Sequence, residues 1–131
     1  STSGHISAFW DVMPTLCEIA GAPIPQQTDG ISFVTELKGE KQKKHDYLYW
    51  EFNESIYKKK NQYKQAVRMG DWKGIYYIDY ERFELYNLKK DIAEKNNLAD
   101  KKPGIVKQIK DIMKKAHVPS ERFPLLKEER Q

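Results

Sequence analysis

The sequence predicts an α+β fold, in which a small antiparallel sheet of about four strands packs against a C-terminal helix and a further helix precedes the sheet. Two runs rich in aromatic and branched residues, 65–69 and 72–78, are separated only by Gly70 and Asp71. A two-residue loop with glycine first favours a type II′ hairpin turn, because glycine reaches the positive φ required there without steric cost. Apolar residues at three- and four-residue steps over 105–116 predict the covering helix.

Two more runs complete the predicted sheet. Residues 45–52, HDYLYWEF, place Leu48, Trp50 and Phe52 in alternation with polar and tyrosine side chains, which is typical of a strand. Residues 83–88, FELYNL, alternate less regularly, as expected of a strand that is partly covered on both faces. The polar residues 53–63 are expected to connect the first strand to the hairpin.

The helix before the sheet is predicted over about 11–20. Asp11 is expected to cap its first amides, and Gly21 allows the left-handed turn that ends it. Pro14 restricts the start to Asp11 or Val12, because proline is tolerated only in the first turn. The apolar face of this helix consists of Val12, Leu16, Ile19 and Ala20. A short helical turn is expected over 32–38.

The helix after the sheet opens at Pro103. Its apolar stripe includes Ile109 and Met113, and its lysines lie off that stripe. Packing the stripe on one face of the sheet buries both surfaces. The remaining tail, 117–131, contains two prolines and is predicted to be extended, either wrapping the domain or fraying.

Composition excludes several classes of protein. With 131 residues the chain fits one domain, and its 12% aromatic content argues against disorder. The net charge of +4 is a small excess. The basic runs 41–44 and 57–64 are interpreted as solvated loops, so no nucleic acid is expected as a partner. No apolar run approaches the roughly 18 residues of a membrane span, and no membrane partner is expected.

Three segments in order resemble the sulfatase family of sulfuric ester hydrolases: DVMPTLCEIAGAPIPQQTDGISF, then QAVRMGDWK, then ELYNLKKDIAEKNNLAD. The chain departs from the family pattern at Asn87, where Asp is usual, and at 92–93, where Pro-Gly is frequent. The resemblance implies that residues 1–40 are the tail of a sulfatase catalytic domain. Residues 41–131 then form the family's C-terminal subdomain.

The resemblance also implies what this chain lacks. Sulfatases use a formylglycine made within a C/S-x-P-S-R motif and a calcium ion, and the sequence contains neither that motif nor a D-x-D-x-D-G loop. We therefore expect no catalytic residue, no metal site and no cofactor here, and no activity of the chain alone. Cys17 is interpreted as a small buried hydrophobe.

The expected partners follow from the same resemblance. They are the N-terminal catalytic domain of the parent protein and a sulfated sugar, and the parent is expected to be a bacterial glycan sulfatase that is periplasmic or secreted. Aromatic side chains that normally rest against the catalytic domain would be exposed in the chain alone. Self-association of the chain is therefore a further expectation.

Three residues are candidates for substrate contact: His45, before the first strand, and Glu51 and Asn53, at its end. Each has an ordinary structural alternative. His45 follows a lysine run and can face solvent, and Glu51 can pair across the strands with Arg68. His117, just past the last helical turn, is interpreted as a cap favoured by the helix dipole, and His5 is not expected to form a site.

A second function class stays open from the sequence: a freestanding basic and aromatic module that binds an anionic polymer, either RNA or a sulfated glycan. Such a module needs exposed stacking aromatics and clustered cations on its sheet. Affinity that falls steeply with salt would distinguish it from a sulfatase subdomain.

Overall fold

The computed structural model describes residues 2–53 and 63–130. The chain forms two compact units, Ser1–Asp46 and Tyr47–Gln131. The division predicted after residue 40 concerns the larger protein and stays a prediction. The connection expected at 53–63, with most of its basic run, lies outside the described residues.

The first unit contains the 3-10 helix η1 (Phe9–Asp11), helix α1 (Val12–Ala20) and the short helix α2 (Val34–Leu37). Helix α1 ends at Gly21, whose φ of 67° is in the left-handed region. A residue with a Cβ would be strained at that φ, so glycine ends the helix at low cost. The predicted positions of both helices are confirmed.

The two faces of α1 are buried unequally. Pro14 and Thr15 are buried against the rest of the first unit. The predicted apolar face is instead exposed, with Leu16 58% and Ile19 61% accessible. Cys17 is half-buried, so its interpretation as a small buried hydrophobe is wrong. The helix is amphipathic as predicted, but nothing within its own unit covers its apolar face.

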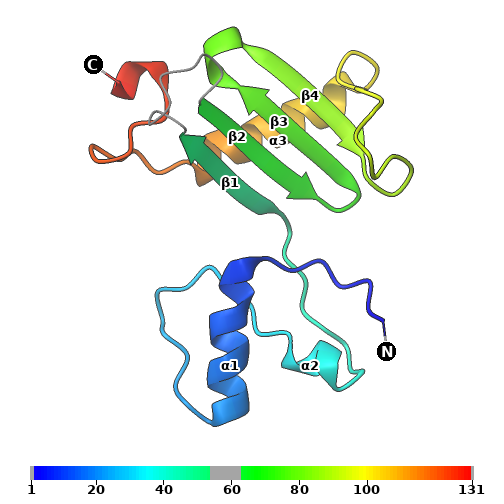
Figure 1. The fold of residues 1–131 in the computed structure, drawn as a ribbon, viewed down its shortest axis with the longest axis vertical. Coiled ribbons are helices and arrows are strands. Elements are labelled where there is room, and N and C mark those ends of the chain that lie inside the picture. Colours follow the sequence, from blue (N-terminus) through cyan, green and yellow to red (C-terminus); the bar gives the residue numbers. More distant parts are fainter. Residues whose placement is uncertain (1, 54–62, 131) are drawn as a thin grey trace. The chain divides into compact units, whose positions relative to one another are not determined.

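The second unit is built on a four-stranded antiparallel sheet in the order β1-β2-β3-β4 (Figure 1). The strands are Leu48–Asn53, Tyr63–Met69, Trp72–Tyr77 and Arg82–Asn87, and each pairs with the next along the chain. The pairing of Met69 with Trp72 leaves Gly70 and Asp71 as a two-residue loop, in which only Gly70 has a positive φ, of 55°. The predicted α+β fold and its hairpin are confirmed.

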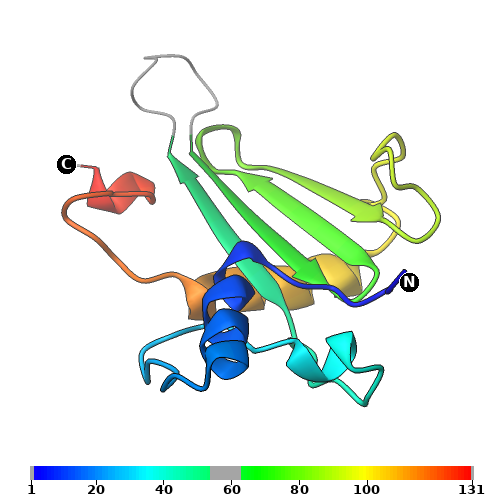
Figure 2. The same cartoon turned by 60° about the horizontal axis from the view of Figure 1, so that its bottom comes forward.

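Helix α3 (Pro103–Ala116) lies across one face of this sheet (Figures 1 and 2). Ile109 and Met113 form the core with Val67 and Leu85, and all four are buried. Gly74 lets the helix approach closely, because a Cβ there would lie 2.8 Å from Ile109 Cγ2. The predicted packing of the apolar stripe on the sheet is confirmed.

No helix of the described segments, 2–53 and 63–130, is both long and apolar enough to cross a membrane. After α3 the chain continues as an extended segment that ends in the 3-10 helix η4 (Lys127–Glu129). We call residues 118–130 the C-terminal strap.

Candidate functional site

The three residues predicted to contact substrate fall in different units. His45 belongs to the first unit, whereas Glu51 and Asn53 belong to strand β1 of the second. Each therefore has to be judged by the contacts within its own unit.

His45 is held by Asp11. Its Nε2 lies 2.8 Å from Asp11 Oδ1, and the Asp11 side chain is completely buried. Asp11 Oδ1 also accepts a hydrogen bond from the Ile31 amide at 2.8 Å, and Oδ2 accepts one from the Ala8 amide at 2.7 Å. Because Asp11 accepts from three separate segments, it ties the first unit together.

The predicted role of Asp11 as a cap of α1 is wrong, since its side chain bonds no amide of that helix. Burial acts to raise the pKa of Asp11, but the hydrogen bonds from Ala8, Ile31 and His45 outweigh it and lower the pKa below 3.8. Asp11 is therefore ionised at neutral pH. The Thr15 hydroxyl, which donates to the Asp11 carbonyl at 2.6 Å and accepts from the Phe33 amide at 3.1 Å, extends this network.

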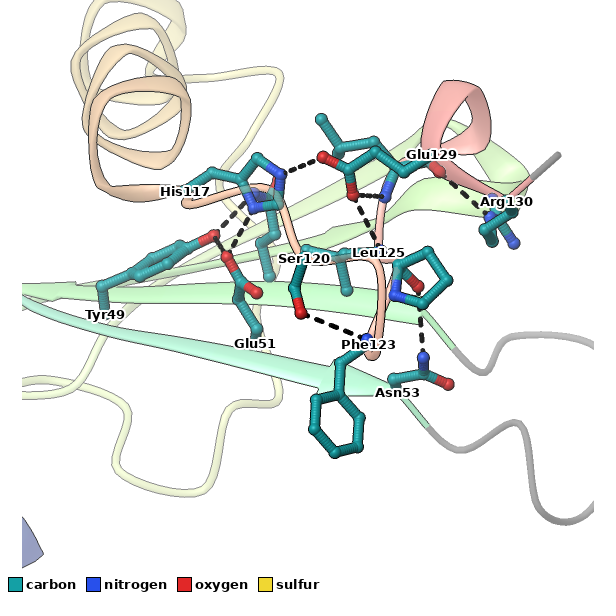
Figure 3. A network of polar contacts seen from close by, with 12 residues as sticks. Tyr49, Glu51, Asn53, His117, Ser120, Phe123, Leu125, Glu129 and Arg130 are labelled. Atoms are coloured by element: carbon teal, nitrogen blue, oxygen red, sulfur yellow. Dashed lines mark hydrogen bonds and ion pairs between the residues drawn. The ribbon is translucent and has the colours of Figure 1, made fainter.

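Glu51 takes part in a second network, at the end of strand β1 (Figure 3). Its Oε1 accepts the Tyr49 hydroxyl at 2.5 Å and lies 2.6 Å from His117 Nδ1. Arg68 is not its partner, because the register places Gln65 opposite Glu51 and Leu48 opposite Arg68. The alternative that paired Glu51 with Arg68 is wrong.

The ring of His117 lies between two carboxylates (Figure 3). Its Nε2 is 2.6 Å from Glu129 Oε1, while Nδ1 bonds Glu51, and the side chain is 7% exposed. Its backbone amide donates to the Met113 carbonyl at 3.1 Å, so the residue does end α3. The ring, however, bonds carboxylates from β1 and η4, and the simple dipole-capping interpretation is incomplete.

Asn53 joins β1 to the strap. Its Nδ2 donates to the Pro124 carbonyl at 3.2 Å (Figure 3). Burial, followed by the hydrogen bond to Glu51, raises the pKa of Tyr49 far above its ordinary value, so the phenol stays neutral. Gln65 then donates to the Tyr49 oxygen at 2.7 Å. These contacts make the end of β1 a continuous polar network with the strap.

The segment ELYNLKKDIAEKNNLAD has a structural role. Asn97 Oδ1 accepts from the amides of Leu85 and Ala99, both at 3.0 Å, and so fixes the loop along edge strand β4. The Asp91 carboxylate accepts the amides of Lys95 at 3.1 Å and Asn96 at 2.8 Å. These side chains close a turn and do not converge on a reactive centre.

The sheet face opposite α3 combines aromatic rings with cations. In one register row, Lys64 Nζ lies 5.5 Å from the ring centroids of both Phe52 and Tyr77, and the Arg82 guanidinium lies 4.3 Å from Tyr77. Trp50 is 40% and Phe52 49% exposed. The face offers flat apolar surface with positive charge, suited to contact with a large partner.

The described residues do not fit a calcium ion. Calcium takes six to eight oxygen ligands, and within 2–53 and 63–130 no three His, Cys, Asp or Glu side chains gather as a metal site. The two networks can orient groups and hold segments together. They do not assemble a nucleophile with a base.

Sequence reasoning missed two members of these networks. The sequence predicts Asp11 only as a cap and gives no indication of a role for Glu129. The signal for Asp11 is weak, because its partners at positions 8, 31 and 45 have no common spacing. Glu129 lies 12 positions after His117 and outside any periodic element, so no local pattern reveals their contact.

Comparison with known proteins identifies the family. The family described as "N-sulphoglucosamine sulphohydrolase, C-terminal" matches residues 3–119. The chain is 41% identical over 90 residues to a delta 4,5-hexuronate-2-O-sulfatase of Bacteroides thetaiotaomicron, which covers 68% of the chain and 18% of that protein. It is 32% identical over 120 residues to an N-acetylglucosamine-6-O-sulfatase of the same bacterium, covering 86% of the chain and 21% of that protein.

Solved structures agree with this match. A structure described as a 2-O GAG sulfatase has a TM-score of 0.69 at 31% identity and covers 81% of this chain and 23% of that one. The chain spans about a fifth of the length of the curated relatives it matches. By the family match over residues 3–119, the chain belongs to the sulfatase family and corresponds to its C-terminal region.

Proposed function

We propose that this chain serves a sulfatase that hydrolyses sulfate esters of a sugar, and that it supports the catalytic region and forms part of the rim of the substrate pocket. The family match over residues 3–119 carries this proposal. The relatives named above are sulfatases of hexuronate and N-acetylglucosamine. A sulfated glycan unit is therefore the substrate class.

The chemical step belongs to the catalytic region. In that region the family's formylglycine would attack the sulfate ester, and calcium would stabilise the charge that develops on the sulfate oxygens. This sequence has no C/S-x-P-S-R motif. The residues of this chain act by binding and positioning, and the chain alone is inactive.

Two surfaces fit the supporting role. One is the apolar face of α1, including Leu16 and Ile19. The other is the sheet face opposite α3, including Trp50 and Phe52. Large apolar side chains that are exposed together on one face are typical of a surface that binds a partner. The catalytic region, expected in the part of the relatives that this chain does not span, is the occupant proposed for both.

His45, Glu51 and Asn53 are proposed as rim residues. If His45 donates through Nε2 to the Asp11 carboxylate, its Nδ1 remains as an acceptor for a sugar hydroxyl. Glu51 is 31% exposed and uses only Oε1 in the contacts with Tyr49 and His117, which leaves Oε2 as a second acceptor. Asn53 can present its amide beside Glu51, at the same end of β1.

The test compares the chain with a longer protein that includes a catalytic region. Both are assayed with a chromogenic aryl sulfate and with a 2-O-sulfated unsaturated disaccharide, in the presence of calcium. We expect activity only in the longer protein. Activity of the chain alone would overturn the assignment of the chemistry to the catalytic region.

The rim assignment has a separate test in the longer protein. Glu51→Gln and His45→Gln are expected to raise KM for the disaccharide while hydrolysis of the small aryl sulfate changes little. Lys107→Gln, on the exposed face of α3, is the control. Equal losses with both substrates would show that the two residues only stabilise the fold.

The expected self-association is tested on the chain by sedimentation velocity. The double variant Trp50→Ser/Phe52→Ser is expected to sediment as a monomer even where the unsubstituted chain forms dimers. The reason is that these two side chains supply exposed apolar area on the sheet. A monomer at all concentrations before substitution would count against self-association.

A further inference from the structure

The C-terminal strap, residues 118–130, is largely outside the family match, which ends at residue 119. It leaves the end of α3 and runs back to the end of β1, as the orange-to-red segment in Figure 1 shows. The strap is not a loose tail, since Leu125 within it is 1% exposed. Its position therefore depends on specific contacts with the sheet.

Three sets of contacts hold the strap, and the first is the hydrogen bond that Asn53 Nδ2 donates to the Pro124 carbonyl at 3.2 Å. At its middle, Glu129 Oε2 accepts the amides of Leu125 at 2.9 Å and Leu126 at 3.0 Å, while Oε1 bonds His117 (Figure 3). At its end, Lys127 pairs with Glu81 and Arg130 with Asp79, both at 2.8 Å. The Glu129 carboxylate thus links the fold of the strap to the ring of His117.

The two contacts of the His117 ring can form together only if the ring is charged. A carboxylate accepts hydrogen bonds and cannot donate one. Both ring nitrogens face carboxylate oxygens at 2.6 Å, so both must carry hydrogen. Neutral imidazole has one N–H, and imidazolium has two. The docked strap therefore requires protonated His117.

We propose that His117 is a proton-controlled latch: the imidazolium clamps the strap to β1 through Glu129 and Glu51, and loss of its proton releases the strap. On deprotonation one ring nitrogen becomes a lone-pair acceptor that faces a carboxylate. That contact is repulsive, and the Glu129 carboxylate loses its charged partner. The strap then loses the contact that orders its middle.

The charged groups around His117 favour the protonated ring. Burial acts to lower its pKa, but the hydrogen bonds and charges of Glu129 and Glu51 outweigh burial and raise the pKa above 6.5. Lys110 and Lys114 of α3 border the same pocket and oppose this effect. The raised pKa of Tyr49 in β1 keeps its phenol neutral, and Gln65 of β2, which also lines the pocket, has no ionisable group.

The direction of each pKa shift sets the pH range of the latch. The contribution of His117 is fully present below pH 6.5 and is lost as the pH rises through its raised pKa. The hydrogen bonds from His117 and from the Leu126 and Leu125 amides lower the pKa of Glu129 from 4.5 to about 2, so its contribution is lost as the pH falls towards that value. The strap is held most firmly between these limits, from about pH 4.5 to 6.5.

Release of the strap would open a pocket. Leu126 of the strap forms one wall of a cavity of about 240 Å³, and Gln65, Tyr76 and Met113 line the rest with the lysines of α3. Moving Leu126 away would expose the apolar parts of that lining. Loss of the His117 proton would therefore lead to exposure of the end of α3.

The test is nuclear magnetic resonance of the 131-residue chain between pH 5 and 10. The ¹⁵N shifts of the His117 ring report its protonation, and hydrogen exchange of the Leu125 and Leu126 amides, corrected for intrinsic rates, reports strap docking. We expect both ring nitrogens to be protonated at pH 6. We also expect protection of the two amides to fall with the same midpoint as the ring titration, above pH 6.5.

Three variants separate the latch from general stability. His117→Gln is expected to lower the protection at pH 6 by about tenfold or more, as for the loss of one hydrogen bond to a charged group, and to remove the midpoint. Glu129→Gln, which keeps the ring and α3 intact, is expected to lower the ring pKa. Lys115→Gln, on the exposed side of α3, is the matched control and should leave both profiles unchanged.

Two results would overturn the proposal. One is a His117 ring that is neutral at pH 6. The other is an unchanged pH profile of strap protection in His117→Gln or, if that variant does not fold, in Glu129→Gln. Neither readout depends on sulfatase activity, so the outcome is independent of the proposed function.

Discussion

Helices α1 and α3 are both amphipathic, yet the structure buries their apolar faces very differently. In α3, Ile109 and Met113 are buried against the sheet. In α1, Leu16 and Ile19 are exposed, and the buried residues are Pro14 and Thr15. The spacing of apolar residues shows which face of a helix avoids water. It does not show whether the covering surface lies within the same chain.

The two units are also stabilised by different interactions. The second unit is held by apolar packing, which contributes about 1.5–3 kcal/mol for each buried large side chain. The first unit depends on the hydrogen bonds of Asp11 and Thr15.

The largest expected effect is that of a charge placed on each apolar face. Ile109→Asp puts an unpaired carboxylate into the core and is expected to destabilise the second unit by more than about 4 kcal/mol, which detaches α3. Leu16→Asp, on exposed α1, is expected to stay within about 0.5 kcal/mol. Urea unfolding of the chain measures both. Similar losses of stability would contradict the contrast between the helices.

The next largest effect concerns the first unit. Asp11→Ala leaves the partly buried amides of Ala8 and Ile31 without their acceptor, at a cost of up to about 1–3 kcal/mol for each. Hydrogen exchange of the Ile31 amide should accelerate, while the Val67 amide in the sheet should not change. Loss of protection at both amides would show that the units do not unfold independently.

The Asp11 carboxylate also makes the stability of the first unit depend on pH. Since the pKa of Asp11 is lowered from 3.8, its contribution is present above that pH and is lost as the pH falls through the lowered pKa. Protection of Ile31 should fall below about pH 3.8 in the native chain. Asp11→Asn should abolish that dependence, and a fall of equal size in this variant would assign it to other groups.

A smaller effect tests how closely α3 approaches the sheet. The added methyl of Gly74→Ala would lie 2.8 Å from both Ile109 Cγ2 and Phe83 Cζ, so overpacking should cost about 1–3 kcal/mol. Gly104, in the first turn of α3, has open space around it. Gly104→Ala should be neutral or stabilising by up to about 1 kcal/mol. Thermal melting distinguishes the two, and equal shifts would argue against tight packing at Gly74.

The smallest effect is expected from Lys110→Ala. Its ammonium lies 5.6 Å from the ring centroids of Tyr76 and Phe83, which favours a loss of about 0.5–1 kcal/mol. Lys107→Ala, without such a ring contact among the described residues, is the control. If Lys110→Ala lowered the free energy of unfolding as much as Gly74→Ala does, this surface contact would contribute as much to stability as the close packing at Gly74.

The sequence predicted the sheet and its helix well because the signals are local. The Gly70–Asp71 loop fixes the β2–β3 register, and the stripe through Ile109 and Met113 fixes the face of α3. The three segments in order, of which 84–100 is the last, indicated the family, although the side chains of 84–100 proved structural.

The networks could not be predicted in the same way. His117 meets Glu51, 66 positions earlier in the chain, because α3 packs across the sheet, and it meets Glu129 because the strap folds back towards β1. Asp11 meets Ile31 and His45 through turns with no periodic pattern. Such contacts depend on the tertiary path of the chain, and composition or spacing does not encode them locally.

The order of the strands has a consequence for synthesis of the protein. Each strand pairs with the one before it, so the sheet can assemble in the order in which it leaves the ribosome, through contacts that are short in sequence. Helix α3 is translated after all four strands, and Val67 and Leu85 are not covered by it until then. At roughly 5–20 residues per second its 14 residues take about 1–3 s to translate. Ribosome stalling before Pro103 would leave an apolar sheet for chaperones to bind.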